Sequence, residues 1–315
     1  MRLRLGTVVV LALATLLGSR LPALGQQDQP QFSEQVSVGY VLVPVVVQGA
    51  RGPVANLKRK DFQLRVDGEE IPIESFESGD APFSLFLLQD LSGSMELLGK
   101  LRSSRRILDC FLDQAGPGDR FALHTFAGGR VETAVVLTSD TARLREAAKS
   151  WKGYGTTALH DAIAWLPELM VESPSTRRAV LLVSDGLDNA STLDATEARQ
   201  RVRASEVPVY VIGLETGSPF EITAEGRKRY RYADVMNLLA HLTGGRYYSA
   251  FDEEGEDRAC TSVLEQLRHQ YILGFSAAGV GDPGPHQIEV EVNRRSVEIS
   301  HRLSYEGRSP VKEQQ

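Results

Sequence analysis

Hydrophobic and polar residues alternate in the first part of the chain. The segment 36–47 is rich in β-branched residues. Residues 62–66 and 71–73 then alternate on either side of Asp67 and Gly68. An Asp-Gly pair between two alternating runs is typical of a β-hairpin. This part of the chain is therefore predicted to form a small antiparallel sheet.

The middle of the chain has a different pattern, in which short, fully apolar runs are separated by stretches of helical period. The apolar runs predict strands at 83–88, 121–126, 131–137, 179–183, 209–214 and 247–251. Leu97, Leu101 and Leu108 share one face at helical spacing, which predicts a helix that begins at about Met95. Strands that are apolar on both faces and alternate with helices indicate a mostly parallel sheet covered by helices. We therefore predict a doubly wound α/β domain over residues 81–269.

Alternation returns in the last part of the chain, at 270–306. The first strand of a parallel sheet enters at the edge away from its carboxyl end, and a final helix that runs antiparallel to the strands leaves at that same edge. Both flanks of the α/β domain should therefore emerge close together. We predict that residues 36–80 and 270–306 pair into one small β domain, with the α/β domain inserted between them and a short tail at 307–315.

The first 25 residues have the three-part pattern of a secretory signal peptide. Two arginines lie within 1–4, the segment 5–17 is nearly all apolar, and small residues at 23 and 25 precede a cut before Gln26. The apolar run of about 13 residues is shorter than the roughly 20 that a membrane span needs. We expect an exported protein, secreted or periplasmic, with a linker at 26–35 and no transmembrane segment in the mature chain.

Composition narrows the classes of function. Lys and Arg total 35 against 41 Asp and Glu, a net charge of −6, so the chain lacks the positive field that gathers phosphate backbones. We expect no nucleic-acid partner. Two cysteines, Cys110 and Cys260, cannot form a four-thiolate zinc site, but they leave either two free thiols or one disulfide.

Oxygen-bearing side chains follow two of the predicted strands and fill one glycine-rich loop. They are Asp90, Ser92 and Ser94 after the strand 83–88, Asp185 after the strand 179–183, and Thr156 or Thr157 in the loop 153–157. Open parallel sheets bind ligands beyond the carboxyl ends of their strands. Hard oxygen ligands suit a hard cation such as Mg²⁺ or Mn²⁺. The alternative is that Ser92 or Ser94 only caps the following helix.

On this three-part motif, residues 81–269 resemble a von Willebrand factor type A domain with a metal-ion-dependent adhesion site. The resemblance implies that Mg²⁺, or alternatively Mn²⁺ or Ca²⁺, is held by Asp90, Ser92, Ser94, Thr157 and Asp185. Thr157 is preferred to Thr156 because residues 158–163 match the helix start of the family. In that family an acidic residue of a partner protein fills the open coordination position, which implies recognition or adhesion through the cation.

The flanking segments are similar to a secreted acidobacterial subgroup in which such a domain sits between β segments. The similarity is carried by residues 43–47, 60–62, 67–68, 81–85 and 270–275. The first and last helices of the resembling fold are neighbours, so a Cys110–Cys260 disulfide is sterically feasible there. If adhesion-type domains switch by sliding the last helix along the first, such a bond would hold one register and one affinity.

Three functions are compatible with the motif. We favour a non-enzymatic protein that binds a partner protein, or alternatively a carbohydrate, that offers a carboxylate. Metal-assisted hydrolysis would need a general base, for which His160 is nearest in the sequence, and the third alternative is a structural envelope scaffold. No catalytic or cofactor-binding residue is assigned. Asp188 and Asn189 are expected to cap a helix that begins near Ser191.

Overall fold

The computed structural model describes residues 40–169, 175–203, 207–214, 220–222, 228–230, 233–277 and 284–307. The predicted signal peptide, the linker at 26–35 and the tail beyond Gly307 lie outside these ranges. None of the helices within them combines the length and the apolar character that crossing a membrane requires.

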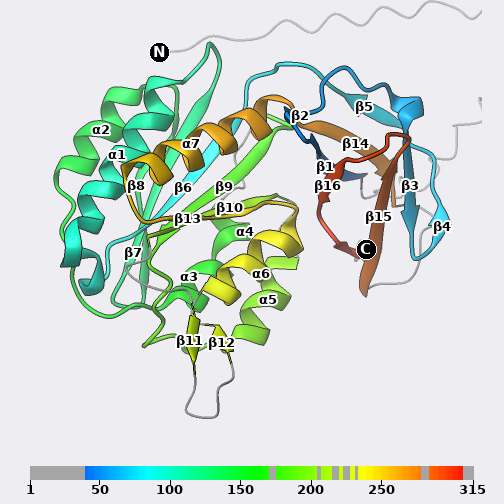
Figure 1. The fold of residues 1–315 in the computed structure, drawn as a ribbon. Helices are drawn as coiled ribbons and strands as arrows, with labels where there is room; N and C mark the ends of the chain where they lie inside the picture. Colours follow the sequence, from blue (N-terminus) through cyan, green and yellow to red (C-terminus); the bar gives the residue numbers. More distant parts are fainter. Residues whose placement is uncertain are drawn as a thin grey trace, which may run out of the picture. The chain divides into compact units, whose positions relative to one another are not determined.

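A six-stranded sheet forms the centre of the α/β domain, in the order β13-β10-β9-β6-β7-β8 (Figure 1). Its strands are β6 (Ser84–Asp90), β7 (Arg120–Ala127), β8 (Arg130–Thr138), β9 (Arg178–Ser184), β10 (Val209–Leu214) and β13 (Tyr247–Ala250). All neighbours pair in parallel except β7 and β8. The predicted fold class, a mostly parallel α/β sheet with separate antiparallel segments, is confirmed.

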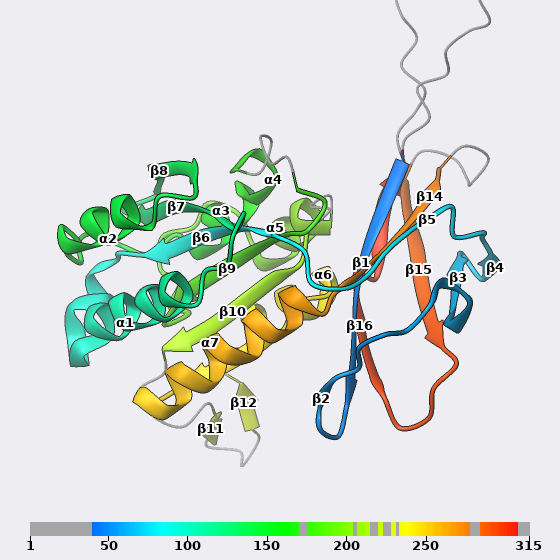
Figure 2. The ribbon, with the colours of Figure 1, turned by 90° about the horizontal axis from the view of Figure 1, so that it is seen from above.

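Helices cover both faces of this sheet, as Figures 1 and 2 show. One face carries α1 (Lys100–Asp113), α2 (Thr141–Lys149) and α7 (Glu253–Arg268), and the other carries α3 (Leu159–Ala164), α4 (Leu166–Leu169), α5 (Ala195–Arg203) and α6 (Ala233–Thr243). Successive strand residues point to opposite faces. Leu85 and Leu87 of β6 therefore pack with α1 and α7, whereas Phe86 and Leu88 pack with α3 and α6.

The two flanking segments pair with each other. One sheet has the order β16-β1-β14-β5 with β2 on β1, and the other has the order β17-β15-β3-β4. Their strands are β1 (Tyr40–Gly49), β2 (Gly52–Pro53), β3 (Phe62–Val66), β4 (Glu69–Glu70), β5 (Ser75–Glu77), β14 (Tyr271–Ser276), β15 (Gly284–Val292), β16 (Glu298–His301) and β17 (Ser304–Gly307). Tyr40 is opposite Ser276, and Val66 is opposite Ile288. Strands from both ends of the chain thus share one apolar core.

A short turn and a short hairpin lie outside these sheets and helices. A 3₁₀ turn, η1 (Arg59–Asp61), precedes β3, and β11 (Phe220–Ile222) pairs with β12 (Lys228–Tyr230) as a hairpin. The predicted hairpin at Asp67 and Gly68 joins β3 to β4, and both residues have positive φ angles, 51° and 85°. A tight hairpin turn requires this conformation.

The first helix begins later than the sequence pattern predicts. Residues after Ser92 form a 3₁₀ segment, η2 (Gly93–Gly99), which is interrupted at Leu97 and Leu98, and α1 begins only at Lys100. Leu97 was predicted on the buried face and is instead 60% exposed. The interruption changes the helical phase, so Lys100 and Leu101 begin the buried stripe of α1.

Candidate metal centre

The first two candidate loops are joined by backbone hydrogen bonds. Gly93 N donates to Gly155 O at 3.1 Å, and Tyr154 N donates to Leu91 O at 2.9 Å. A Cβ atom on Gly153 would lie only 2.8 Å from the carbonyl oxygen of Ser92. Glycine is therefore required at this position for the loops to approach so closely.

The second and third loops are joined in the same way. Thr157 N donates to Asn189 Oδ1 at 2.9 Å, while Asn189 N and Ala190 N both donate to Thr157 O at 3.0 Å. Thr157 is buried, whereas Thr156 is exposed and its carbonyl oxygen accepts from Gly128 N. The three loops that carry the candidate ligands thus form one connected unit at the carboxyl ends of β6 and β9.

Asp90 lies at the end of β6 and is fully buried. Its carboxylate accepts hydrogen bonds from Ser184 Oγ at 2.6 Å and Ser92 N at 2.8 Å. Burial and, to a smaller extent, the negative charge of Asp185 raise the pKa of Asp90 to about 6, against the lowering effect of these hydrogen bonds. The two carboxylates therefore lie near enough to repel each other, and a bound cation would relieve that repulsion.

Ser92 does not act as an ordinary helix cap. Ser92 occupies the N-cap position of η2, but its side chain makes no capping hydrogen bond. Its hydroxyl oxygen lies 3.2 Å from that of Ser94. The capping alternative is therefore wrong for Ser92, and the two hydroxyl oxygens lie side by side as neighbouring cation ligands would.

Asp185 has a partner that the sequence analysis missed. Lys100, the first residue of α1, places its Nζ 2.6 Å from Asp185 Oδ2, and both side chains are buried. The other carboxylate oxygen of Asp185 accepts from Leu187 N. The helical spacing of the sequence could have indicated that Lys100 is buried. Lys100 lies on the same stripe of α1 as Ser104, Ile107 and Phe111, which are all buried.

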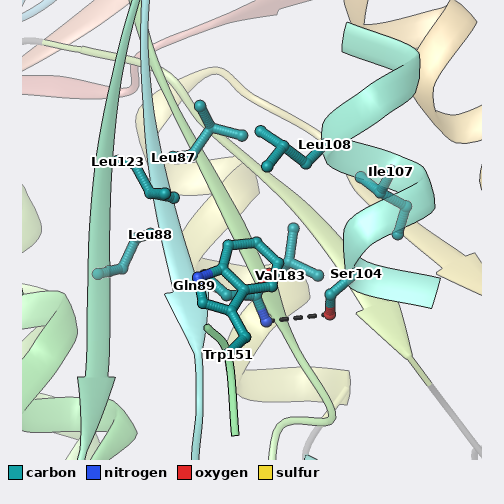
Figure 3. A pocket seen from close by; sticks show the side chains of 9 residues that line it. All are labelled: Leu87, Leu88, Gln89, Ser104, Ile107, Leu108, Leu123, Trp151 and Val183. Carbon is teal, nitrogen blue, oxygen red and sulfur yellow. Dashed lines mark hydrogen bonds between the residues drawn. The ribbon is translucent and has the colours of Figure 1, made fainter. Parts of the chain in front are cut away.

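The backbone of Asp90 is braced against α1 from within the core. Gln89 Nε2 donates to Asp90 O at 2.7 Å and to Ser104 Oγ at 3.0 Å, and Figure 3 marks the second bond. The pocket in Figure 3 is lined mainly by apolar side chains of β6, β7 and α1. Among its polar groups, Gln89 and Ser104 bind each other, whereas the indole nitrogen of Trp151 is buried without a hydrogen-bond partner among the described residues. Gln89 therefore links the end of β6, at Asp90, to α1.

Residues beyond Asp185 have structural roles that differ from the prediction. No helix begins near Ser191: α5 begins at Ala195, and Asp194 Oδ1 caps it by accepting from Thr196 N and Glu197 N. Asp188 instead accepts from His160 N at 3.0 Å, at the start of α3, and from the hydroxyl of Ser191.

His160, the candidate base of the hydrolase alternative, is held by the protein backbone. Its Nδ1 lies 3.2 Å from Leu193 O and 3.6 Å from Asp188 Oδ2. This arrangement orients the ring toward the segment after Asp185. The expectation of no enzymatic activity stays a prediction.

The candidate ligands are chemically consistent with a divalent cation. They comprise two carboxylates and three hydroxyl groups, and Mg²⁺, Mn²⁺ and Ca²⁺ all accept oxygen ligands. Within the described ranges, no group of three or more His, Cys, Asp and Glu side chains could hold a metal ion. A site formed here therefore depends on Ser and Thr oxygens.

Cys110 and Cys260 form a disulfide between α1 and α7. The same two helices are joined by Arg106, which makes ion pairs with Glu253, Glu256 and Asp257. Of the two alternatives for the cysteines, the structure contains the bridge.

Comparison with known proteins identifies the central part of the chain. Residues 85–187, which contain all five candidate ligands, match the family model of the von Willebrand factor type A domain. The chain is 26% identical over 218 residues to a UPF0353 protein of Mycolicibacterium gilvum (strain PYR-GCK), which covers 62% of this chain and 63% of that protein. The chain therefore spans less than two thirds of this relative.

Several solved structures are also similar. An aerotolerance-related membrane protein of Bacteroides fragilis is 21% identical and covers 59% of this chain and 98% of its own, with a TM-score of 0.46. BatB of Bacteroides thetaiotaomicron is 17% identical, with 58% and 98% covered and a TM-score of 0.45. A von Willebrand factor type A protein of Catenulispora acidiphila is 13% identical, with 86% and 75% covered and a TM-score of 0.47.

Proposed function

We propose that the von Willebrand factor type A domain of this chain binds a divalent cation and recognises a carboxylate of a partner protein through it. Mg²⁺ is the first candidate, with Mn²⁺ and Ca²⁺ as alternatives. The ligands would be Asp90, Ser92, Ser94, Thr157 and Asp185. The supporting observation is the backbone bonding that joins their three loops.

Charge explains why recognition would depend on the cation. When bound, the cation supplies a Lewis-acidic position for an oxygen anion. Asp90 and Asp185 contribute two negative charges, whereas Ser92, Ser94 and Thr157 contribute neutral oxygens. Without a divalent cation, the two carboxylates outweigh the single positive charge of Lys100, so the centre still repels an acidic partner. Binding of that partner should therefore require the cation.

The surroundings of the candidate site favour a protein partner over a carbohydrate. Leu97 and Leu98 follow the first loop and are 60% and 78% exposed, and Tyr154 of the second loop is also exposed. Exposed large apolar side chains that gather in one region mark interaction surfaces. Leu98 also has a φ angle of 56°, which is unusual for a residue other than glycine.

The disulfide supports export as part of this proposal. Disulfides persist in oxidising compartments and are rare in reducing ones. The Cys110–Cys260 bond is therefore consistent with the predicted signal peptide. We propose a secreted or periplasmic location.

The metal site can be tested by calorimetric titration with Mg²⁺ and Mn²⁺. The wild type should bind one ion, and Asp90→Ala should abolish binding because it removes a buried carboxylate ligand. Glu146→Ala removes an exposed carboxylate, paired with Lys149, and serves as the control. Equal binding by Asp90→Ala and the wild type would exclude this site.

An open coordination position can be tested with Mn²⁺-loaded protein and water-proton relaxation. The ion should enhance relaxation through exchanging water, and acetate, as a carboxylate probe, should reduce the enhancement by displacing that water. Bound Mn²⁺ whose relaxation enhancement acetate does not change would contradict recognition through the cation, while leaving metal binding intact.

A further inference from the structure

Lys100 is a buried cation inside the candidate metal centre. Its Nζ lies 2.6 Å from Asp185 Oδ2, and the two side chains are only 8% and 3% exposed. Lysine is almost never fully buried unless it is paired. The ion pair with Asp185 therefore accounts for the burial of Lys100 at the start of α1.

We propose that Lys100 is an internal counter-cation that competes with the divalent cation for Asp185. This inference rests on the proposed metal binding. In the cation-free protein, the ammonium group neutralises the carboxylate, which would otherwise be buried with only the backbone hydrogen bond from Leu187 N. Binding of a divalent cation to Asp185 must then weaken or break the Lys100–Asp185 pair.

The charges of the centre give the direction of the effect. Asp90, Asp185 and Lys100 together carry a net charge of −1, whereas the two carboxylates alone carry −2. A dication is attracted less strongly to the first set, because Coulomb energy scales with charge and the site is shielded from water. Lys100 should therefore lower the affinity of the centre for Mg²⁺.

The local structure gives the lysine a route away from Asp185. The residues directly before it, Glu96 to Gly99, are all exposed. Gly99 has a left-handed conformation with φ of 77°, and α1 begins immediately after it. The lysine thus lies at the boundary between a buried helix and an exposed segment, where a long flexible side chain can turn its head group toward water.

The first experiment compares metal affinity in two lysine variants. Lys100→Met removes the charge while keeping an unbranched side chain of similar length. Its Mg²⁺ dissociation constant, measured by calorimetry, should be at least about tenfold lower than that of the wild type, which corresponds to about 1.4 kcal/mol. Lys149→Met removes an exposed lysine from α2 and should leave the dissociation constant unchanged.

Thermal unfolding of the same proteins provides a second readout. In chelator, Lys100→Met should unfold at a lower temperature than the wild type, because Asp185 loses its buried partner. Saturating Mg²⁺ should raise its unfolding temperature by more than it raises that of the wild type. Equal increments together with equal dissociation constants would overturn the role of Lys100.

The wild type can be tested without any substitution, which covers the case in which Lys100→Met does not fold. Amine acylation followed by mass spectrometry should find Lys100 protected in chelator and more reactive with Mg²⁺, while Lys149 reacts equally in both. Unchanged protection of Lys100 at a Mg²⁺ concentration that saturates the site would refute displacement.

These results separate the two proposals. If the wild type binds Mg²⁺ and Lys100→Met binds it no more tightly, competition by Lys100 is wrong and the metal site stands. If neither protein binds Mg²⁺, Mn²⁺ or Ca²⁺, the proposed function fails and the role of Lys100 fails with it.

Discussion

The disulfide between Cys110 and Cys260 should contribute much of the stability of the α/β domain. The bond closes a loop across a sequence separation of 150 residues, from α1 to α7. Replacing both cysteines by alanine removes this constraint from the unfolded chain. It leaves the ion pairs of Arg106 with α7 in place, so the two helices should still pack in the native state.

The size of the effect follows from the length of the loop. The chain-entropy relation gives about 5 kcal/mol at 25 °C for a closed loop of this length, while losses of a native disulfide run from about 2 to 5 kcal/mol. We therefore expect the double variant to lose at least about 2 kcal/mol in free energy of unfolding. The upper limit of this loss is the value of about 5 kcal/mol that the chain-entropy relation gives.

Urea unfolding followed by tryptophan fluorescence measures this loss in the right domain. Both tryptophans of the chain, Trp151 and Trp165, belong to the α/β domain. The wild type in reductant is the matched control, because the reductant removes the bond without creating a cavity at buried Cys260.

Partner binding by the oxidised and reduced wild type tests whether the bond fixes the affinity of the domain.

The reasoning would be refuted if the reduced wild type unfolded at the same urea concentration and with the same slope as the oxidised protein. That result would mean that the bond does not restrict the unfolded chain. A loss confined to the alanine variant would assign the effect to the cavity at Cys260 instead.

Two further predictions concern pH and loop contact. His124 is a buried residue of β7 beside Thr133, and desolvation lowers its pKa to about 4. Between pH 6.5 and 4, the unfolded chain therefore binds a proton at His124 that the folded protein does not bind. Unfolding titrations should show the wild type losing up to about 3 kcal/mol across this window relative to His124→Gln, and identical pH slopes would disprove it. Gly153→Ala should force the first two loops apart, at a cost of about 1–3 kcal/mol, and weaken Mg²⁺ binding; unchanged calorimetric affinity would contradict this contact as a determinant of the site.

The sequence predicted the α/β sheet well because its strands are apolar on both faces. Every strand of the six-stranded sheet lies within two residues of its predicted ends. The proximity of the segments that follow β6 and β9, which carry Asp90 and Asp185, was also predictable, since the carboxyl ends of neighbouring parallel strands meet at one edge. The place of Thr157 depended on the family resemblance, and its role as a ligand stays a prediction. These predictions depend on local pattern and on one general property of sheets.

The failures came from long-range polar contacts. Asp188 and Asn189 resemble helix caps in sequence, but they bind the start of α3 and the backbone of Thr157, about 30 residues away in the chain. Lys100 lies 85 residues from Asp185 in the chain. Because lysine is charged, Lys100 was not predicted to belong to the buried stripe of α1. A polar residue in phase with an apolar stripe is the signal that should have been followed.

The α/β domain lies in the sequence between the two β segments that pair with each other, and this arrangement imposes an order of assembly. β1 cannot find its partner β14 until more than two hundred further residues have been synthesised, since Tyr40 is paired with Ser276. The inserted domain is continuous in sequence, and Arg268 at its exit lies over the ring of Phe83 at its entrance, 5.3 Å from the centroid. Once that domain has folded, β1 and β14 are held close together, so most of the entropic cost of closing the loop between these two strands has already been met. The outer sheets should therefore mature last, and a defect in the inserted domain should leave β1 as an unpaired edge prone to aggregation.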